Sequence, residues 1–230
     1  MTLRRGESVL LALGIPVVLL VFFSLVDVLP TPAGARHRVD FLGPGILALA
    51  VMSTAMVSLG IATGFERSYG VLKRLATTPL SRPTLLAAKT VAILAVEVVQ
   101  VLVLVPVALA LGWRPSGNGI AAVAAVLVAT VAFAGLGLLM AGALRAEVTL
   151  AAANGAYLVL LLLGDMIVPL AKLPGALRIV AEALPAAALA DALGHAFGLG
   201  GSMSALHAAV VLVVWAVAAP LAAALTFRWE

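Results

Sequence analysis

Six long apolar stretches, separated by short polar segments, organise the chain. A helix that crosses a membrane needs about 20 mostly apolar residues, and its backbone groups must be satisfied within the helix. The pattern therefore predicts six membrane-spanning helices and an all-α integral membrane fold. The expected spans are 9–28, 41–64, 85–113, 120–144, 148–170 and 205–227.

The composition excludes a soluble protein. Of the 230 residues, 64% are hydrophobic and 10% are charged, and the mean hydropathy is +1.22. Soluble domains are roughly 45–50% apolar and about 25% charged. So few polar residues cannot cover the outside of a soluble globule. A soluble enzyme and a nucleic-acid-binding module are both excluded, and the net charge of +4 reflects membrane topology.

The basic residues predict the orientation of the spans. With six spans both termini lie on one side, and that side holds nine of the 14 Lys and Arg residues. Because cytoplasmic loops are enriched in Lys and Arg, both termini are expected in the cytoplasm. The nine residues are Arg4, Arg5, Arg67, Lys73, Arg74, Arg82, Lys89, Arg145 and Arg228.

An apolar but interrupted stretch precedes the sixth span. Pro174 and Pro185 each suit the first turn of a helix, where a missing N–H costs nothing. Charged residues recur at helical spacing between them and beyond. The stretch predicts two short amphipathic helices, at about 173–200, that dip into or lie on the outer leaflet. A plain external loop with helical turns is the alternative.

The cytoplasmic segment between the second and third spans contains a short amphipathic pattern. Gly64 is expected to end the second span. Beyond it, Val71, Leu72 and Leu75 share one face, while Lys73 and Arg74 lie on the other. This predicts a short helix at about 70–80. A soluble partner could bind such a helix and move both adjacent spans, and a connector with snorkelling basic side chains is the alternative.

The same segment resembles the signature of the type-2 ABC exporter permease family. The family pattern has an acidic residue, a glycine, a leucine-rich basic helix, Thr-Pro-Leu/Val-Ser-Arg and a lysine that leads into the third span. The positions that carry the resemblance here are Glu66, Gly70, Leu75, Thr78, Pro79, Ser81, Arg82 and Lys89. Six spans, cytoplasmic termini and the Phe-Arg-Trp sequence at 227–229 are similar as well.

The resemblance implies a single transmembrane permease domain over 1–230. Such permeases pair as homodimers or heterodimers and bind two cytoplasmic ATPase subunits, which hold ATP and Mg²⁺. The chain has no G-x-x-x-x-G-K-[ST] run, so we expect no catalytic residue and no cofactor in it. The helix at 70–80 would be the coupling helix, and the ATPase-coupling residues would be Glu66, Arg67, Gly70, Leu72, Lys73, Leu75, Thr78 and Pro79.

The expected cargo is a drug, an antibiotic or another apolar small molecule, moved outward from the cytoplasm or the inner leaflet. Lipid or polysaccharide export is the alternative within the same family. A passive channel or a structural membrane subunit is the alternative of a different class. The expected location is the inner (plasma) membrane, as the spans and the resemblance imply. A bacterial source is expected because Arg outnumbers Lys 11 to 3, as in G+C-rich bacterial genomes.

Four polar residues within the spans are candidates for the substrate path. Glu97 lies eight residues after Lys89, roughly 12 Å deeper in the bilayer, and Gln100 shares its face. Interhelical hydrogen bonding is the alternative role for this pair. Asn154 and Asp165 share a face of the fifth span. The chain has no Cys, and its three His residues match no metal-binding spacing, so no metal site is expected.

Small residues at four-residue spacing predict close helix packing. Gly60 and Gly64 form one such pair, and Ala151 and Gly155 form another. Packing within the chain is the preferred interpretation, and a dimer seam is the alternative.

Overall fold

The computed structural model describes residues 6–26, 38–71, 82–166 and 169–226. Within these ranges every regular element is a helix, which confirms the predicted all-α membrane fold. The elements are α1 (Gly6–Leu25), α2 (Arg38–Met52), the π-helix η2 (Ser53–Ser58), α3 (Leu59–Ser68), α5 (Arg82–Ala110), α6 (Gly119–Ala143), α7 (Ala146–Leu163), the 3₁₀-helix η3 (Leu170–Lys172), α8 (Gly175–Glu182), α9 (Pro185–Ala196) and α10 (Ala205–Thr226).

Six apolar helices follow the order of the predicted spans. In the described part of the chain, five helical stretches are long and apolar enough to cross a membrane, and Leu13–Leu25 forms a shorter apolar helix. The five are Arg38–Ser68, Ala87–Ala110, Gly119–Ala143, Ala146–Leu163 and Ala205–Thr226.

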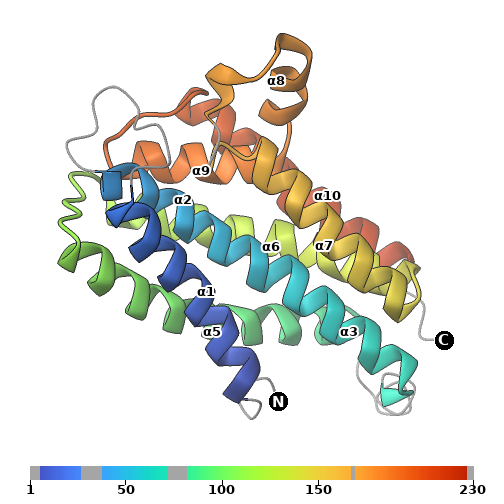
Figure 1. The fold of residues 1–230 in the computed structure, drawn as a ribbon. Coiled ribbons are helices and arrows are strands. Elements are labelled where there is room, and N and C mark those ends of the chain that lie inside the picture. The colour runs from blue at the N-terminus through green and yellow to red at the C-terminus, as the bar shows by residue number, and fades with distance from the viewer. Residues whose placement is uncertain (1–5, 27–37, 72–81, 167–168, 227–230) are drawn as a thin grey trace.

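Figure 1 shows the long helices in one bundle, with α8 and α9 at one end. We call this the α9 end, and we call the opposite end, where α3 ends and α5 begins, the Arg67 end.

The second span is longer than predicted. We expected Gly64 to end it, and this was wrong, because α2, η2 and α3 form one helical stretch to Ser68. Gly64 instead lies against α7, where an added Cβ would be 3.4 Å from the side chain of Thr149. Gly60 lies against α6, where a Cβ would be 3.0 Å from the Gly137 carbonyl oxygen. Both glycines therefore serve close packing within the chain, as predicted.

The Ala151–Gly155 pair behaves differently. Both residues are exposed on α7. Among the described residues outside its own helical turn, nothing lies within 4 Å of a Cβ built on Gly155. The described part of the chain therefore does not use this pair for packing.

Only one of the two helices before the last span lies at the surface. The apolar residues Leu177, Ile179 and Val180 of α8 are exposed. In α9, which begins at Pro185 as expected, Ala186–Leu189 are fully buried. Both expected short helices are present, and α9 is buried among the spans whereas α8 is exposed. Their position in the outer leaflet stays a prediction. The small alanine side chains of α9 let it pack closely against α2, α6 and α10, so it belongs to the bundle core.

The fifth span is shorter than predicted. We expected it to run from 148 to 170, and α7 ends at Leu163. Asp165 has a φ of +56°, a left-handed conformation through which a right-handed helix cannot continue. The turn places Asp165 outside the span, at the α9 end.

Candidate functional site

The contacts at the Arg67 end involve the helices that flank, in sequence, the segment predicted to couple to a partner. Glu66 lies in the last turns of α3, and Lys89 lies in α5, seven residues after its start. Their side chains form an ion pair. This pair ties together the two helices that flank residues 72–81. The structure does not describe that segment, so the expected positions of Leu72, Lys73, Leu75, Thr78 and Pro79 lie outside the described residues.

Arg67 connects α3 to the turn between α6 and α7. Its guanidinium donates to the carbonyl oxygens of Gly142 and Leu144, each at 2.5 Å. These carbonyls belong to the last turn and C-cap of α6, where no intrahelical N–H remains to bind them. A planar guanidinium can satisfy two such acceptors at once. Arg67 therefore fixes α3 to the α6–α7 turn.

A charged pocket of about 430 Å³ lies beside these contacts. Arg67, Arg145 and Glu147 line it, together with Gly64, Ser68, Gly70 and Ala146. Gly70 has a φ of +71° and follows the Tyr69 C-cap of α3, so its left-handed conformation ends the helix. Glu66, Arg67 and Gly70 thus lie at one end of the bundle, and their role in coupling to an ATPase stays a prediction.

A second polar group lies buried in the middle of the bundle. Thr130 Oγ1 of α6 is 2.6 Å from Glu97 Oε2, and Gln100 Nε2 donates to Thr54 Oγ1 of η2 at 2.9 Å. All four residues are at most 2% exposed. Glu97 and Gln100 therefore make interhelical hydrogen bonds that join α5 to α6 and η2. Their role in a substrate path stays a prediction.

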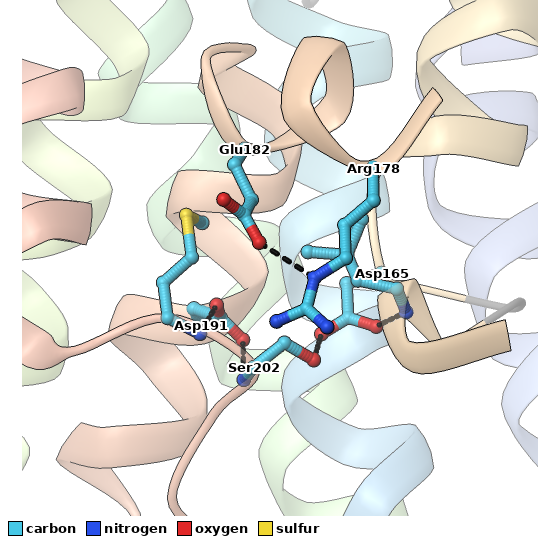
Figure 2. A network of polar contacts seen from close by, with 7 residues as sticks. Asp165, Arg178, Glu182, Asp191 and Ser202 are labelled. Atoms are coloured by element: carbon cyan, nitrogen blue, oxygen red, sulfur yellow. Dashed lines mark hydrogen bonds and ion pairs between the residues drawn. The ribbon is translucent and has the colours of Figure 1, made fainter. Parts of the chain in front are cut away.

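The third polar group lies at the α9 end. Asp165 accepts hydrogen bonds from the Leu170 N–H at 2.6 Å and from Ser202 Oγ at 2.9 Å. Asp191 of α9 accepts from the N–H groups of Ser202 and Met203 at 2.9 and 2.7 Å. Figure 2 shows these contacts around Ser202, together with the Arg178–Glu182 ion pair of α8. The two carboxyl groups thus hold the loop before α10 against α7 and α9.

The surroundings of Asp165 change its acidity. The pKa of the Asp165 carboxyl is raised to about 6 by the balance of several effects. Burial raises it most, the Leu170 N–H bond lowers it, and the nearby Asp191 carboxylate raises it. A pocket of about 380 Å³ adjoins both acids. We call Asp165, Asp191 and Ser202 the clasp. Its Asp165 carboxyl titrates in mildly acidic solution.

The four candidates for a substrate path lie in three places. Glu97 and Gln100 share one groove, and Asp165 belongs to the clasp at the α9 end. Asn154 is exposed on α7 and donates to the Leu150 carbonyl of its own helix at 2.8 Å. The structure does not bring Asn154 and Asp165 together with the buried pair.

Sequence reasoning missed the partners of the predicted polar residues. Thr54 and Thr130 bind Gln100 and Glu97, and Ser202 joins the two acids of the clasp. A depth count could have found Thr130, because it lies near the middle of its span, as Glu97 does. No comparable signal marks Ser202, because it lies in an irregular loop.

Comparison with known proteins identifies one family. The family model described as "ABC-2 type transporter" matches residues 2–197, which is most of the chain. A search of curated proteins found no match.

Proposed function

The chain belongs to the ABC-2 type transporter family, and from this premise we propose that it is the permease subunit of an ATP-driven exporter. The cargo that we propose is a drug or another apolar small molecule, moved outward from the cytoplasm or inner leaflet. The family match supports the role of a transmembrane component that is not itself the ATPase. The direction of transport, the energy source and the cargo are the proposal.

The contacts at the Arg67 end carry the proposal. The Glu66–Lys89 ion pair joins α3 to α5, and Arg67 joins α3 to the α6–α7 turn. A partner that binds the segment between Gly70 and Arg82 would therefore pull on three spans through charged contacts. Such contacts are stronger and more directional than neutral ones. The arrangement supports a coupling role for this end of the bundle.

The proposed complex contains two ATPase subunits and a second permease subunit, as a homodimer or a heterodimer. ATP and Mg²⁺ would be held by the ATPase subunits. The bundle would lie in the inner (plasma) membrane with both termini and the Arg67 end in the cytoplasm. The excess of Lys and Arg on that side supports this orientation.

Mostly apolar walls support small apolar molecules as the cargo. The groove that holds Glu97 and Gln100 has a volume of about 290 Å³ and is otherwise lined by apolar residues and glycine. This volume is close to the lower end of small-molecule sites, which is roughly 300 Å³.

Co-purification with an ATPase tests the proposal. The tagged chain is expressed with the ABC ATPase encoded beside it, as wild type and as the variant Leu72→Asp/Leu75→Asp. We expect the wild type to retain the ATPase and the variant to lose it while still inserting into membranes. Leu177→Asp is the matched control, because Leu177 is an exposed leucine at the opposite end, and it should retain the ATPase.

Two results would contradict the proposal. One is a wild-type chain that retains no ATPase, which would favour a passive channel or a structural subunit. The other is equal loss of the ATPase in Leu177→Asp and in the double variant, because the effect would then not belong to the predicted coupling segment.

A further inference from the structure

An apolar groove opens between α5 and α6. Its floor comes from α2, and Leu193 and Phe197 lie at the α9 end of it. The rim residues Val98, Leu102 and Val123 are 57%, 68% and 60% exposed. Since these positions lie within helices apolar enough to span a membrane, the groove opens toward the lipid side of the bundle. A ligand dissolved in the bilayer can therefore reach it directly.

Glu97 gives this apolar groove one ionisable group. Its side chain lines the groove and is 2% exposed, and its Oε1 atom has no hydrogen-bond partner among the residues that the structure describes. None of the lining residues is basic, and Lys89 is paired with Glu66. A buried carboxylate is stable only when it is paired with a charge or with hydrogen-bond donors. The groove therefore lacks a donor at Oε1.

Thr130 cannot supply the hydrogen-bond donor that Glu97 Oε1 lacks. Its hydroxyl oxygen is 2.6 Å from Glu97 Oε2 and 2.8 Å from the Val126 carbonyl oxygen. A hydroxyl carries a single hydrogen, so it donates to one of these two acceptors. In either case Oε1 stays unsatisfied, and a donor from a ligand would complete the group.

We propose that this groove binds a small amphiphilic amine from the bilayer. The ammonium group donates to Glu97 Oε1, and the apolar body of the ligand lies between α5 and α6. Charge complementarity selects a cation over a neutral or anionic molecule of the same shape. The volume of about 290 Å³ suits a compact amine better than a lipid with two acyl chains. That such an amine is cargo rests on the proposed function, whereas its binding does not.

Direct binding to the purified chain tests the inference without ATP or an ATPase. The probe is tritiated 1-aminoadamantane, measured on the chain in lipid nanodiscs near neutral pH, with empty nanodiscs to subtract partitioning. The neutral isostere 1-adamantanol serves as competitor. We expect saturable binding of the amine, with the alcohol at least about tenfold weaker, because a charge-assisted hydrogen bond exceeds a neutral one by about that factor.

Three variants locate the site. Glu97→Gln keeps the shape and removes the charge, and we expect it to weaken amine binding by about tenfold or more. Glu147→Gln removes an exposed carboxylate at the Arg67 end and should bind as the wild type does. Val123→Trp fills the rim and should weaken binding with Glu97 intact. Because Val123 is 60% exposed, this variant remains informative if Glu97→Gln fails to fold.

The inference is overturned by any of three results: no saturable binding above empty nanodiscs, equal affinity for amine and alcohol, or wild-type affinity in both Glu97→Gln and Val123→Trp. If the wild type binds no amine but still retains the ATPase, only this inference falls and the proposed function stands. If it binds the amine but retains no ATPase, the reverse holds.

Discussion

Glu66 of α3 and Lys89 of α5 lie 23 positions apart in the chain and form an ion pair at the Arg67 end of the bundle. The pair joins the two helices that flank the segment predicted to couple to an ATPase. If that segment moves, the pair would help α3 and α5 to move as one unit. This relationship leads to the first of four predictions.

Exchanging the charges of this pair should separate its role in stability from its role in coupling. The side chains of Lys89 and Glu66 are 15% and 40% exposed, so the pair should contribute only about 0.2–1 kcal/mol to the free energy of unfolding. Glu66→Lys and Lys89→Glu should each lower ATPase activity in the reconstituted complex well below that of the wild type. The double exchange should restore most of it.

The double-mutant cycle needs both thermal unfolding and ATPase activity as readouts. If both single variants retain full ATPase activity, the pair does not transmit motion. If the double exchange is as defective as the single variants, the residues act separately rather than as a pair.

Arg67 should contribute more to stability than any exposed arginine at the same end. Arg67→Ala leaves the carbonyls of Gly142 and Leu144 without their donor. Hydrogen bonds to charged groups contribute about 1.5–3 kcal/mol, and we expect the free energy of unfolding in detergent to fall by about this amount. Arg67→Lys should restore part of the loss.

The control is Arg145→Ala, because Arg145 is exposed and its loss should change the free energy of unfolding by less than about 0.5 kcal/mol. Equal unfolding midpoints for Arg67→Ala and Arg145→Ala would show that the carbonyl contacts do not stabilise the α6–α7 turn.

Two glycine-to-alanine substitutions should have opposite effects. A Cβ on Gly137 would lie 2.5 Å from the Met56 carbonyl oxygen, so Gly137→Ala must separate α6 from η2 and should cost about 1–3 kcal/mol. A Cβ on Gly155 meets nothing within 4 Å, so Gly155→Ala should stabilise α7 by up to about 1 kcal/mol.

Unfolding of the two variants by denaturant in the same detergent gives the sign of each change. Stabilisation by Gly137→Ala would contradict the close approach of α6 and η2. Destabilisation of the isolated chain by Gly155→Ala would contradict the open surface at α7.

The stability of the chain should depend on pH through Asp165. Its pKa is raised from the usual 3.8 to about 6 in the folded state, so the folded state holds this proton more tightly than the unfolded state does. The contribution of protonated Asp165 to the free energy of unfolding is complete at pH values below the pKa of this carboxyl in the unfolded state. It is lost as the pH rises toward 6. We expect the free energy of unfolding to fall by about 1–3 kcal/mol across this range.

Asp165→Asn removes the titrating group and keeps a side chain of the same shape, so the slope between about pH 4 and pH 6 should flatten. Asn154→Ala on α7 changes a side chain that does not titrate, and as the control it should leave the slope unchanged. Unfolding measured at a series of pH values compares the three proteins, and an unchanged slope in Asp165→Asn would contradict the assignment.

The order of the apolar helices follows the order of the predicted spans, because membrane insertion depends on local properties. Each span needs a sufficient run of apolar residues and satisfies its backbone within itself. Glu66, Arg67 and Gly70 lie at one end of the bundle because they follow directly after the apolar run of the second span. The end of the second span was wrong because a glycine can either end a helix or admit a neighbour. Only the presence of Thr149 on α7 decides between the two at Gly64.

The amino-acid sequence by itself determined that this is an all-α membrane protein, because mean hydropathy and run length are sums over neighbouring residues. Tertiary structure alone decided that α9 is buried, that Glu97 meets Thr130, and that Asp165 and Asp191 share Ser202. These contacts join residues on different helices. They depend on how closely and at what rotation the helices pack, and that packing is a property of all the helices together.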